Sequence, residues 1–155
     1  MIKIAIAALT LLAALPACAQ THPPQTAVAP PEPEPRAQAL PYSPAIVSGD
    51  TIYLAGHLGF LPGTRNYPEG GIGPQTTQVL ENIGATLETV EATHADIVRC
   101  QVFLADITDF AAMNAAYRAF FPETPPARTT VGVAGLAANA LIEIECTAVR
   151  GHGGQ

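Results

Sequence analysis

Hydrophobic and polar positions first form a regular pattern near Pro41. Two short β-rich runs at 45–48 and 51–55 flank Gly49-Asp50, a turn sequence that predicts a hairpin. Residues 61–73 are rich in glycine and proline and predict a long loop. A helix is then expected from about 74 to 92, because apolar residues follow at helical spacing: Val79, Leu80, Ile83, Leu87 and Val90.

The second half of the pattern predicts a strand, a helix and two further strands. Thr93-His94-Ala95-Asp96 has the form of a helix or turn start. In the strand expected at 97–104, one face should carry Val98, Cys100, Val102 and Leu104. A helix is expected at 109–121, with an apolar stripe of Phe110, Met113, Tyr117, Phe120 and Phe121. The last two strands are expected at 129–134 and 141–149.

The order β-β-α-β-α-β-β predicts an α+β sandwich, with two helices on one face of a mixed sheet. In the last strand one set of residues should face the helices: Ile142, Ile144, Cys146 and Ala148. Glu143, Glu145 and Thr147 then point away from them. This second set would be solvated in a monomer or would line an interface in an oligomer.

The N-terminus has the pattern of an export signal, expected at 1–19. A basic start, Met1 to Lys3, precedes twelve mostly apolar residues, which are too few to span a bilayer comfortably. Ala17-Cys18-Ala19 suits ordinary signal peptidase, whereas Leu15-Pro16-Ala17-Cys18 resembles a lipobox in which Cys18 is lipidated. Both readings stay open. The protein is expected in the periplasm, either soluble or held to the membrane only through a lipid on Cys18.

Composition divides the rest of the chain. Seven prolines fall between Ala19 and Pro41, so 20–41 is expected to be an extended, disordered linker. The folded domain is expected at 42–151, followed by a disordered tail at 152–155.

Charge excludes several classes of function. The whole chain carries −6, and its only lysine, Lys3, lies in the expected signal, so the mature chain would carry six arginines against thirteen carboxylates, or −7. A nucleic-acid partner is therefore not expected, since binding a phosphate backbone needs a basic face. Schiff-base chemistry and a Walker-type phosphate loop are also excluded for the mature chain, because both need a lysine amine.

Arg128 and Glu143 are the residues best suited to chemistry. An arginine offers a planar fork to a carboxylate, and a glutamate on a partly buried strand can act as a base toward water. Taken alone, the commoner role of each is that of a surface or ion-pair residue. Asn114 falls on the apolar stripe of the second helix, either as a structural bridge or as a pocket residue.

The histidines and cysteines leave fewer expectations. The four histidines lack metal-ligand spacing, so no metal is expected: His22, His57, His94 and His152. Cys100 and Cys146 should both face the helices, where they form a disulfide if their strands are neighbours and otherwise stay buried thiols, the commoner outcome.

Several stretches together resemble the RidA/YjgF family of reactive-intermediate deaminases. The N-terminal ones are Leu40-Pro41-Tyr42-Ser43-Pro44-Ala45, Ile52-Tyr53-Leu54-Ala55-Gly56-His57, Gln75-Thr76 and Leu80-Glu81-Asn82-Ile83. The C-terminal ones are Asp109-Phe110, Met113-Asn114-Ala115-Ala116-Tyr117, Phe120-Phe121-Pro122, Pro126-Ala127-Arg128-Thr129-Thr130-Val131, Ile142-Glu143-Ile144-Glu145 and Ala148-Val149-Arg150. The resemblance covers about residues 40 to 150.

This resemblance implies a chorismate-mutase-like homotrimer with its sites at subunit interfaces. It also implies cofactor-free and metal-free hydrolysis of small 2-imino or enamine acids, such as 2-iminopropanoate, to keto acids and ammonia. By position, Arg128 matches the arginine that holds the substrate carboxylate, and Glu143 matches the acid that activates water. Tyr42, Gly56 and Asn114 match pocket positions, with the Gly56 amide as a donor.

Two departures from the family pattern affect the substrate. Ala55-Gly56-His57 stands where the pattern has Ser-Gly-Gln, and Arg128-Thr129-Thr130 stands where it has Arg-Ser-Cys, which makes Thr130 a substrate-binding candidate. The alternative hypothesis is therefore a non-catalytic trimer of the same fold that binds a carboxylate metabolite.

Overall fold

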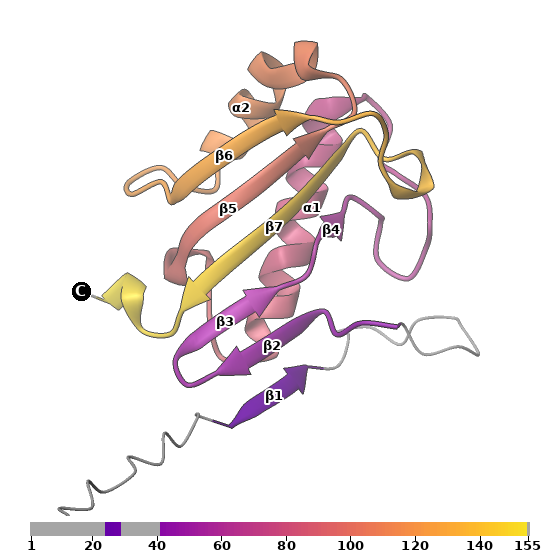
Figure 1. The fold of residues 1–155 in the computed structure, drawn as a ribbon. Helices are drawn as coiled ribbons and strands as arrows, with labels where there is room; N and C mark the ends of the chain where they lie inside the picture. The colour runs from indigo at the N-terminus through magenta and orange to yellow at the C-terminus, as the bar shows by residue number, and fades with distance from the viewer. Residues whose placement is uncertain (1–23, 29–40, 155) are drawn as a thin grey trace, which may run out of the picture.

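A mixed sheet of seven strands carries two helices on one of its faces (Figure 1). The computed structural model describes residues 24–28 and 41–154. The predicted α+β sandwich is confirmed. The expected signal at 1–19, with Cys18, and most of the expected linker lie outside the described residues, and the trimer stays a prediction.

The sheet has the order β1-β2-β3-β7-β5-β6, with β4 also paired to β7. Its strands are β1 Gln25–Val28, β2 Ala45–Ser48, β3 Thr51–Leu54, β4 His57–Leu58, β5 Ile97–Leu104, β6 Ala127–Gly132 and β7 Ile142–Val149. Only the β5–β6 pair is parallel among these strands, and the β2–β3 pair is the predicted hairpin. β7 thus has partners on both sides and lies at the centre of the sheet.

The helices are α1, Ile72–Glu88, and α2, Phe110–Arg118. Helix α1 begins and ends earlier than expected, so Val90 lies beyond it and is only partly buried. The other residues of its expected stripe are fully buried: Val79, Leu80, Ile83 and Leu87. They pack with the inward side chains of β3, β5 and β7 to form the core.

Two positions of the expected apolar faces are corrected by the structure. A register shift between Ile97 and Arg99 at the start of β5 places Ile97 in the core and leaves Val98 only partly buried. Alternation beyond this irregularity is as predicted, with Cys100, Val102 and Leu104 buried. Phe110 begins α2 but is 41% exposed, so it does not belong to the core as Met113 and Tyr117 do.

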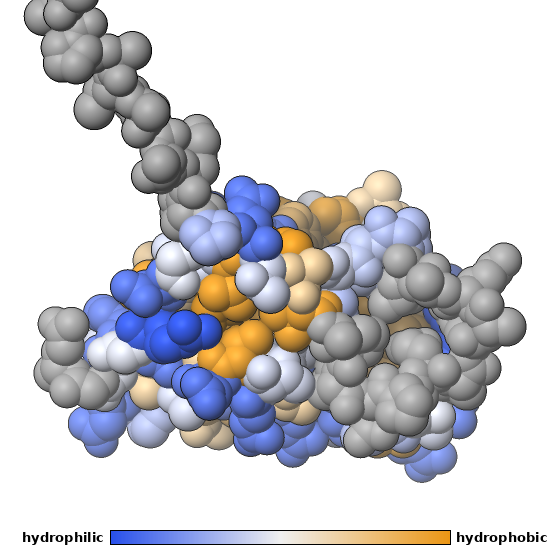
Figure 2. Space-filling model, turned by 90° about the horizontal axis from the view of Figure 1, so that it is seen from below, coloured by the Kyte–Doolittle hydropathy of each residue, from blue (hydrophilic) through white to orange (hydrophobic). Residues whose placement is uncertain are grey.

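Two expected disordered segments contain ordered structure. Gln25–Val28, inside the expected linker, pairs with β2, because four residues without proline can complete an antiparallel ladder. His152–Gly154, inside the expected tail, forms a turn in which the Gly153 amide donates to Asp96 at 3.3 Å. Figure 2 views the molecule from below Figure 1 and shows hydrophobic residues at the middle of that face, bordered by hydrophilic ones.

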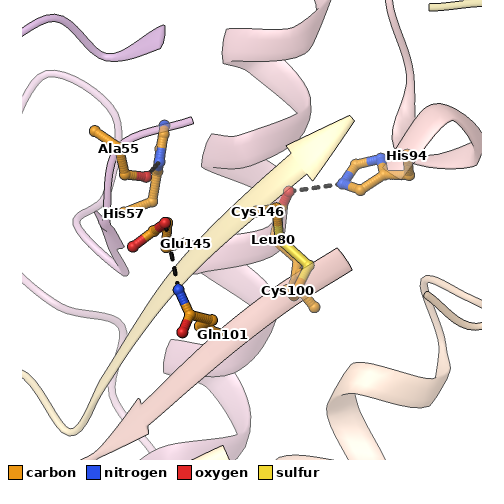
Figure 3. The surroundings of a disulfide bond; sticks show 8 residues. All are labelled: Ala55, His57, Leu80, His94, Cys100, Gln101, Glu145 and Cys146. Atoms are coloured by element: carbon orange, nitrogen blue, oxygen red, sulfur yellow. Dashed lines mark hydrogen bonds between the residues drawn. A yellow bond between two sulfur atoms is a disulfide. The ribbon is translucent and has the colours of Figure 1, made fainter. Parts of the chain in front are cut away.

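Strand β7 alternates as its sequence predicts, with every second residue buried from Ile142 to Ala148. Cys146 lies directly opposite Cys100 of β5, and the two are joined in a disulfide (Figure 3). The commoner outcome of two free thiols is therefore wrong here. Sequence alone gave both cysteines the same face but could not show that β5 and β7 are neighbours in register.

The Cys100–Cys146 bond should stabilise the fold by about 4 kcal/mol, because it closes a loop with a sequence separation of 46 in the unfolded chain. Replacing both cysteines with alanine should lower the urea midpoint of unfolding, and a reductant should lower that of the wild type. The double variant is the control, since the reductant should not change its midpoint. An unchanged wild-type midpoint under reduction would contradict this role.

Candidate functional site

Arg128, the second residue of β6, points toward α2. Its parallel partner in the sheet is Cys100, which is buried on the helix side, and paired residues of neighbouring strands share a face. The guanidinium donates through Nη2 to Asn114 Oδ1 at 2.5 Å. It also lies 4.6 Å from the ring centroid of Tyr117 and 5.8 Å from that of Phe110. Helix α2 thus supplies the immediate surroundings of this arginine.

No carboxylate is among these contacts within the described part of the chain. The partners of Arg128 are an amide oxygen, two aromatic rings and, at 3.9 Å, the Met113 sulfur. Aromatic faces attract a cation without neutralising it. The guanidinium can therefore bind an incoming carboxylate with its planar fork. Asn114, which the sequence left as a bridge or a pocket residue, holds one end of that fork.

Two buried hydroxyl groups on the same side have no hydrogen-bond partner in the described structure: Tyr117 and Thr130. Thr130 lies two residues after Arg128, so both side chains leave β6 on the same face. Burial raises the pKa of Tyr117 to about 12, although the positive charge of Arg128 acts in the opposite direction. The phenol therefore stays protonated at neutral pH and remains a donor.

Glu143 belongs to the other face of the sheet. It follows the inward Ile142 on β7, and its register partners are Leu58 of β4 and Phe103 of β5. Partial burial, and then the like charge of Glu145, raise the pKa of Glu143 above its ordinary value. A carboxylate with a raised pKa is a better base.

Gly56 allows Glu143 to lie where it does. A Cβ atom at residue 56 would overlap with the carboxylate oxygen Oε1 of Glu143. Next to Gly56, His57 is tied on both sides: Nδ1 donates to the Ala55 carbonyl at 2.8 Å, and Nε2 lies 2.9 Å from Thr86 Oγ1 on α1 (Figure 3 shows the first contact). Burial lowers the pKa of His57, so the ring is neutral near pH 7 and fixes the backbone around Gly56.

The residues expected at the site therefore form two groups. Arg128, Asn114 and Thr130 lie together on the helix side, and Glu143 lies with Gly56 on the opposite face. The sheet register separates the groups, because Arg128 shares a row with the inward Cys100 and Cys146, whereas Glu143 is an outward residue of β7. Tyr42 lies before β2, is 56% exposed, and forms no hydrogen bond with either group among the described residues.

Sequence reasoning missed the aromatic surroundings of Arg128. Phe110 and Tyr117 were assigned to a core stripe on helical spacing alone, which is the same for a residue that packs and for one that also faces a cation. Their positions seven residues apart on α2, on the side of Asn114, were the available signal. The sequence indicated His57 only as one of four histidines without metal-ligand spacing and as a departure from the family pattern. Among the described residues, no three histidine, cysteine, aspartate or glutamate side chains are grouped as metal ligands would be.

None of the helices that the structure describes is long and apolar enough to cross a membrane.

Comparison with known proteins identifies relatives over most of the chain. Residues 32–150 match the family described as Endoribonuclease L-PSP. Reactive Intermediate Deaminase A, chloroplastic, of Arabidopsis thaliana is 42% identical over 70% of this chain, which spans 58% of that relative's length. The 2-iminobutanoate/2-iminopropanoate deaminase of Homo sapiens is 36% identical over 72% of this chain and 81% of its own.

Solved structures of relatives have the same fold over most of this chain. The YjgF gene product of E. coli superimposes with a TM-score of 0.71 at 37% identity, over 81% of this chain and 98% of its own. A protein of Thermotoga maritima, described as a putative endoribonuclease, gives a TM-score of 0.73 at 35% identity, over 81% of this chain and 97% of its own. The two groups of candidate residues thus lie on a shared fold, and the chain belongs to the Endoribonuclease L-PSP family, which includes the RidA-type deaminases.

Proposed function

We propose that this protein hydrolyses reactive 2-imino acids to 2-keto acids and ammonia. The observation that carries the proposal is a guanidinium without a carboxylate partner among its described contacts, combined with a glutamate of raised pKa. The deaminase names of its relatives support the same reaction class. The name endoribonuclease is less compatible with a net charge of −6, because RNA binding needs a basic surface.

In the proposed reaction Arg128 binds the substrate carboxylate in a bidentate manner, with Asn114 keeping the guanidinium in place. Glu143 takes a proton from water as the water oxygen bonds to C2 and the electrons of the C=N bond move to nitrogen. Glu143 then returns this proton to the nitrogen. Glu143 next takes the proton of the new hydroxyl and passes it to the amino nitrogen as the carbon–nitrogen bond breaks, so ammonia leaves and the keto group remains.

We also propose that the site is divided between two copies of the chain. Arg128 and Glu143 emerge on opposite faces of the sheet, so a substrate that touches both is best served by Arg128 of one copy and Glu143 of the next. A homotrimer, the form implied by the family resemblance, offers such an interface three times. It also covers the outward residues of β7, which a monomer leaves partly exposed.

An exported, periplasmic location remains part of this proposal. The Cys100–Cys146 disulfide supports it, since disulfides persist in oxidising compartments.

The second candidate function, a non-catalytic carboxylate-binding protein, is favoured by Ala55 and Thr130, which change two polar groups of the family pattern. Tight keto-acid binding without ammonia release would select this second function.

The first prediction concerns the two charged residues. In an assay of ammonia release from freshly generated 2-iminopropanoate, Arg128→Ala and Glu143→Gln should each lose about 10²-fold or more in kcat/KM. Arg128→Ala should act mainly on KM, because it removes the carboxylate contact, and Glu143→Gln mainly on kcat. The controls are Arg118→Ala and Glu88→Gln, two exposed positions on the helices that should keep wild-type rates. Wild-type activity equal to the buffer rate would contradict the deaminase proposal.

A second prediction tests the position of Glu143 without changing its charge. Gly56→Ala should reduce kcat about tenfold or more, because the new methyl group must displace the Glu143 carboxylate. Thermal stability should change little, since only the end of a flexible side chain has to move. Gly135→Ala is the matched control, as a Cβ there meets nothing within 4 Å. Equal activity of both variants would show that Glu143 does not need its present position.

A further inference from the structure

The segment after β4 lies beside Glu143. Leu58, the last residue of β4, is the register partner of Glu143, so both side chains lie on the sheet face away from the helices. A Cβ at Gly59 would come within 2.8 Å of the Gln75 carbonyl oxygen, so the chain runs closely along the start of α1 here. Phe60 then opens the loop that leads to α1, directly beyond the pair formed by Leu58 and Glu143.

An aromatic pair forms the first part of this loop. The rings of Phe60 and Tyr67 stack with centroids 4.8 Å apart and an angle of 21° between their planes. The Arg65 guanidinium lies 5.5 Å from the Phe60 centroid. Tyr67 remains only partly buried, so its ring keeps exposed surface.

The pair is held in place from two sides. The Tyr67 hydroxyl donates to the Ala138 carbonyl at 3.3 Å, which joins this loop to the turn before β7; both segments lie on the same side of Figure 1. That turn contains Ala138 and Asn139 in the left-handed region and leads directly into Glu143. Within the loop, the Leu61 amide donates to the Asn66 carbonyl at 2.9 Å. The ring orientation is therefore fixed before any ligand arrives, which lowers the entropy cost of binding.

The charge of Glu143 also reaches Tyr67. Partial burial, and then the negative charge of Glu143, raise the pKa of the Tyr67 phenol above its ordinary value. This agrees with the hydrogen bond to Ala138, in the turn that precedes β7, in placing the Tyr67 hydroxyl near the Glu143 carboxylate.

We propose that Phe60 and Tyr67 form a recognition wall beside Glu143 that selects 2-imino acids with an aromatic side chain over 2-iminopropanoate. The inference rests on the proposed function for the position of the substrate. With the carboxylate on Arg128 of one copy and C2 at Glu143 of the next, the side chain is the remaining substituent on C2. A flat ring gains stacking and apolar burial against Tyr67, whereas a methyl group is too small to gain either.

Binding of the keto-acid products tests the wall without requiring turnover. By calorimetry on the full chain, phenylpyruvate should bind about tenfold more tightly than pyruvate. Tyr67→Leu should remove this difference and leave pyruvate affinity unchanged within about twofold. Tyr67→Phe keeps the ring and should keep most of the preference, which separates the ring from the hydrogen bond to Ala138. Equal affinities in the wild type, or no binding of either acid, would overturn the inference.

Turnover separates this inference from the proposed function. Tyr67→Leu should reduce kcat/KM about tenfold for the imine made from phenylalanine and only about twofold or less for the imine made from alanine. Equal losses for both would overturn the wall and leave Tyr67 as a support of the loop. If neither imine is hydrolysed but phenylpyruvate is preferred in a manner that depends on Tyr67, the proposed reaction fails and the wall stands.

Discussion

The alternation of side chains along β7 is the constraint on which the rest of the structure depends. This strand pairs with β3, β4 and β5, and its buried residues supply the middle of the core. Because successive residues point to opposite faces, burying Ile142 and Ile144 obliges Glu143 to face away from the helices. The same alternation brings Cys146 inward, opposite Cys100. A shift of one residue in the register would bury the glutamates and break the disulfide pair.

Functional consequences follow from the same geometry. Arg128 is held on the helix side by Asn114 and by aromatic rings of α2, and the absence of a side chain at Gly56 leaves room for the Glu143 carboxylate on the other face. Each group alone is insufficient for the proposed reaction. The arginine alone would bind the substrate carboxylate without activating water, and the glutamate alone would have no oriented substrate. Under the proposed function, these two groups of residues act together only where two copies of the chain are in contact. The proposed homotrimer would bring the two groups together and would also cover the exposed residues of β7.

Much of the fold could be predicted because it depends on local patterns. The hairpin, the strand at 97–104 and the two faces of β7 follow from alternation over a few residues. The predictions failed where the structure of a segment is determined by a neighbouring strand. The register shift near Ile97 depends on β7, and the pairing of Gln25–Val28 depends on an available edge of β2. The state of Cys100 could not be decided for the same reason.

The candidate site was predictable in its residue types but not in its arrangement. Arg128, Glu143, Gly56 and Asn114 could be named from their resemblance to a family pattern, yet nothing in the sequence showed that the first two leave the sheet on opposite faces. That fact needs the register of β6 against β5 and of β5 against β7. Phe110 is another example: helical spacing alone predicted a core residue, whereas its side chain is exposed in the structure.

Complementation between two inactive chains tests the divided site most directly. Arg128→Ala and Glu143→Gln chains, unfolded together and refolded at equal amounts, should regain about a quarter of wild-type activity if each site in a trimer takes one residue from each of two neighbours. Mixing Arg128→Ala with the double variant is the control and should regain none. If folded mixed oligomers of the two single variants stay inactive, Arg128 and Glu143 do not meet across an interface, and the site is not divided between copies.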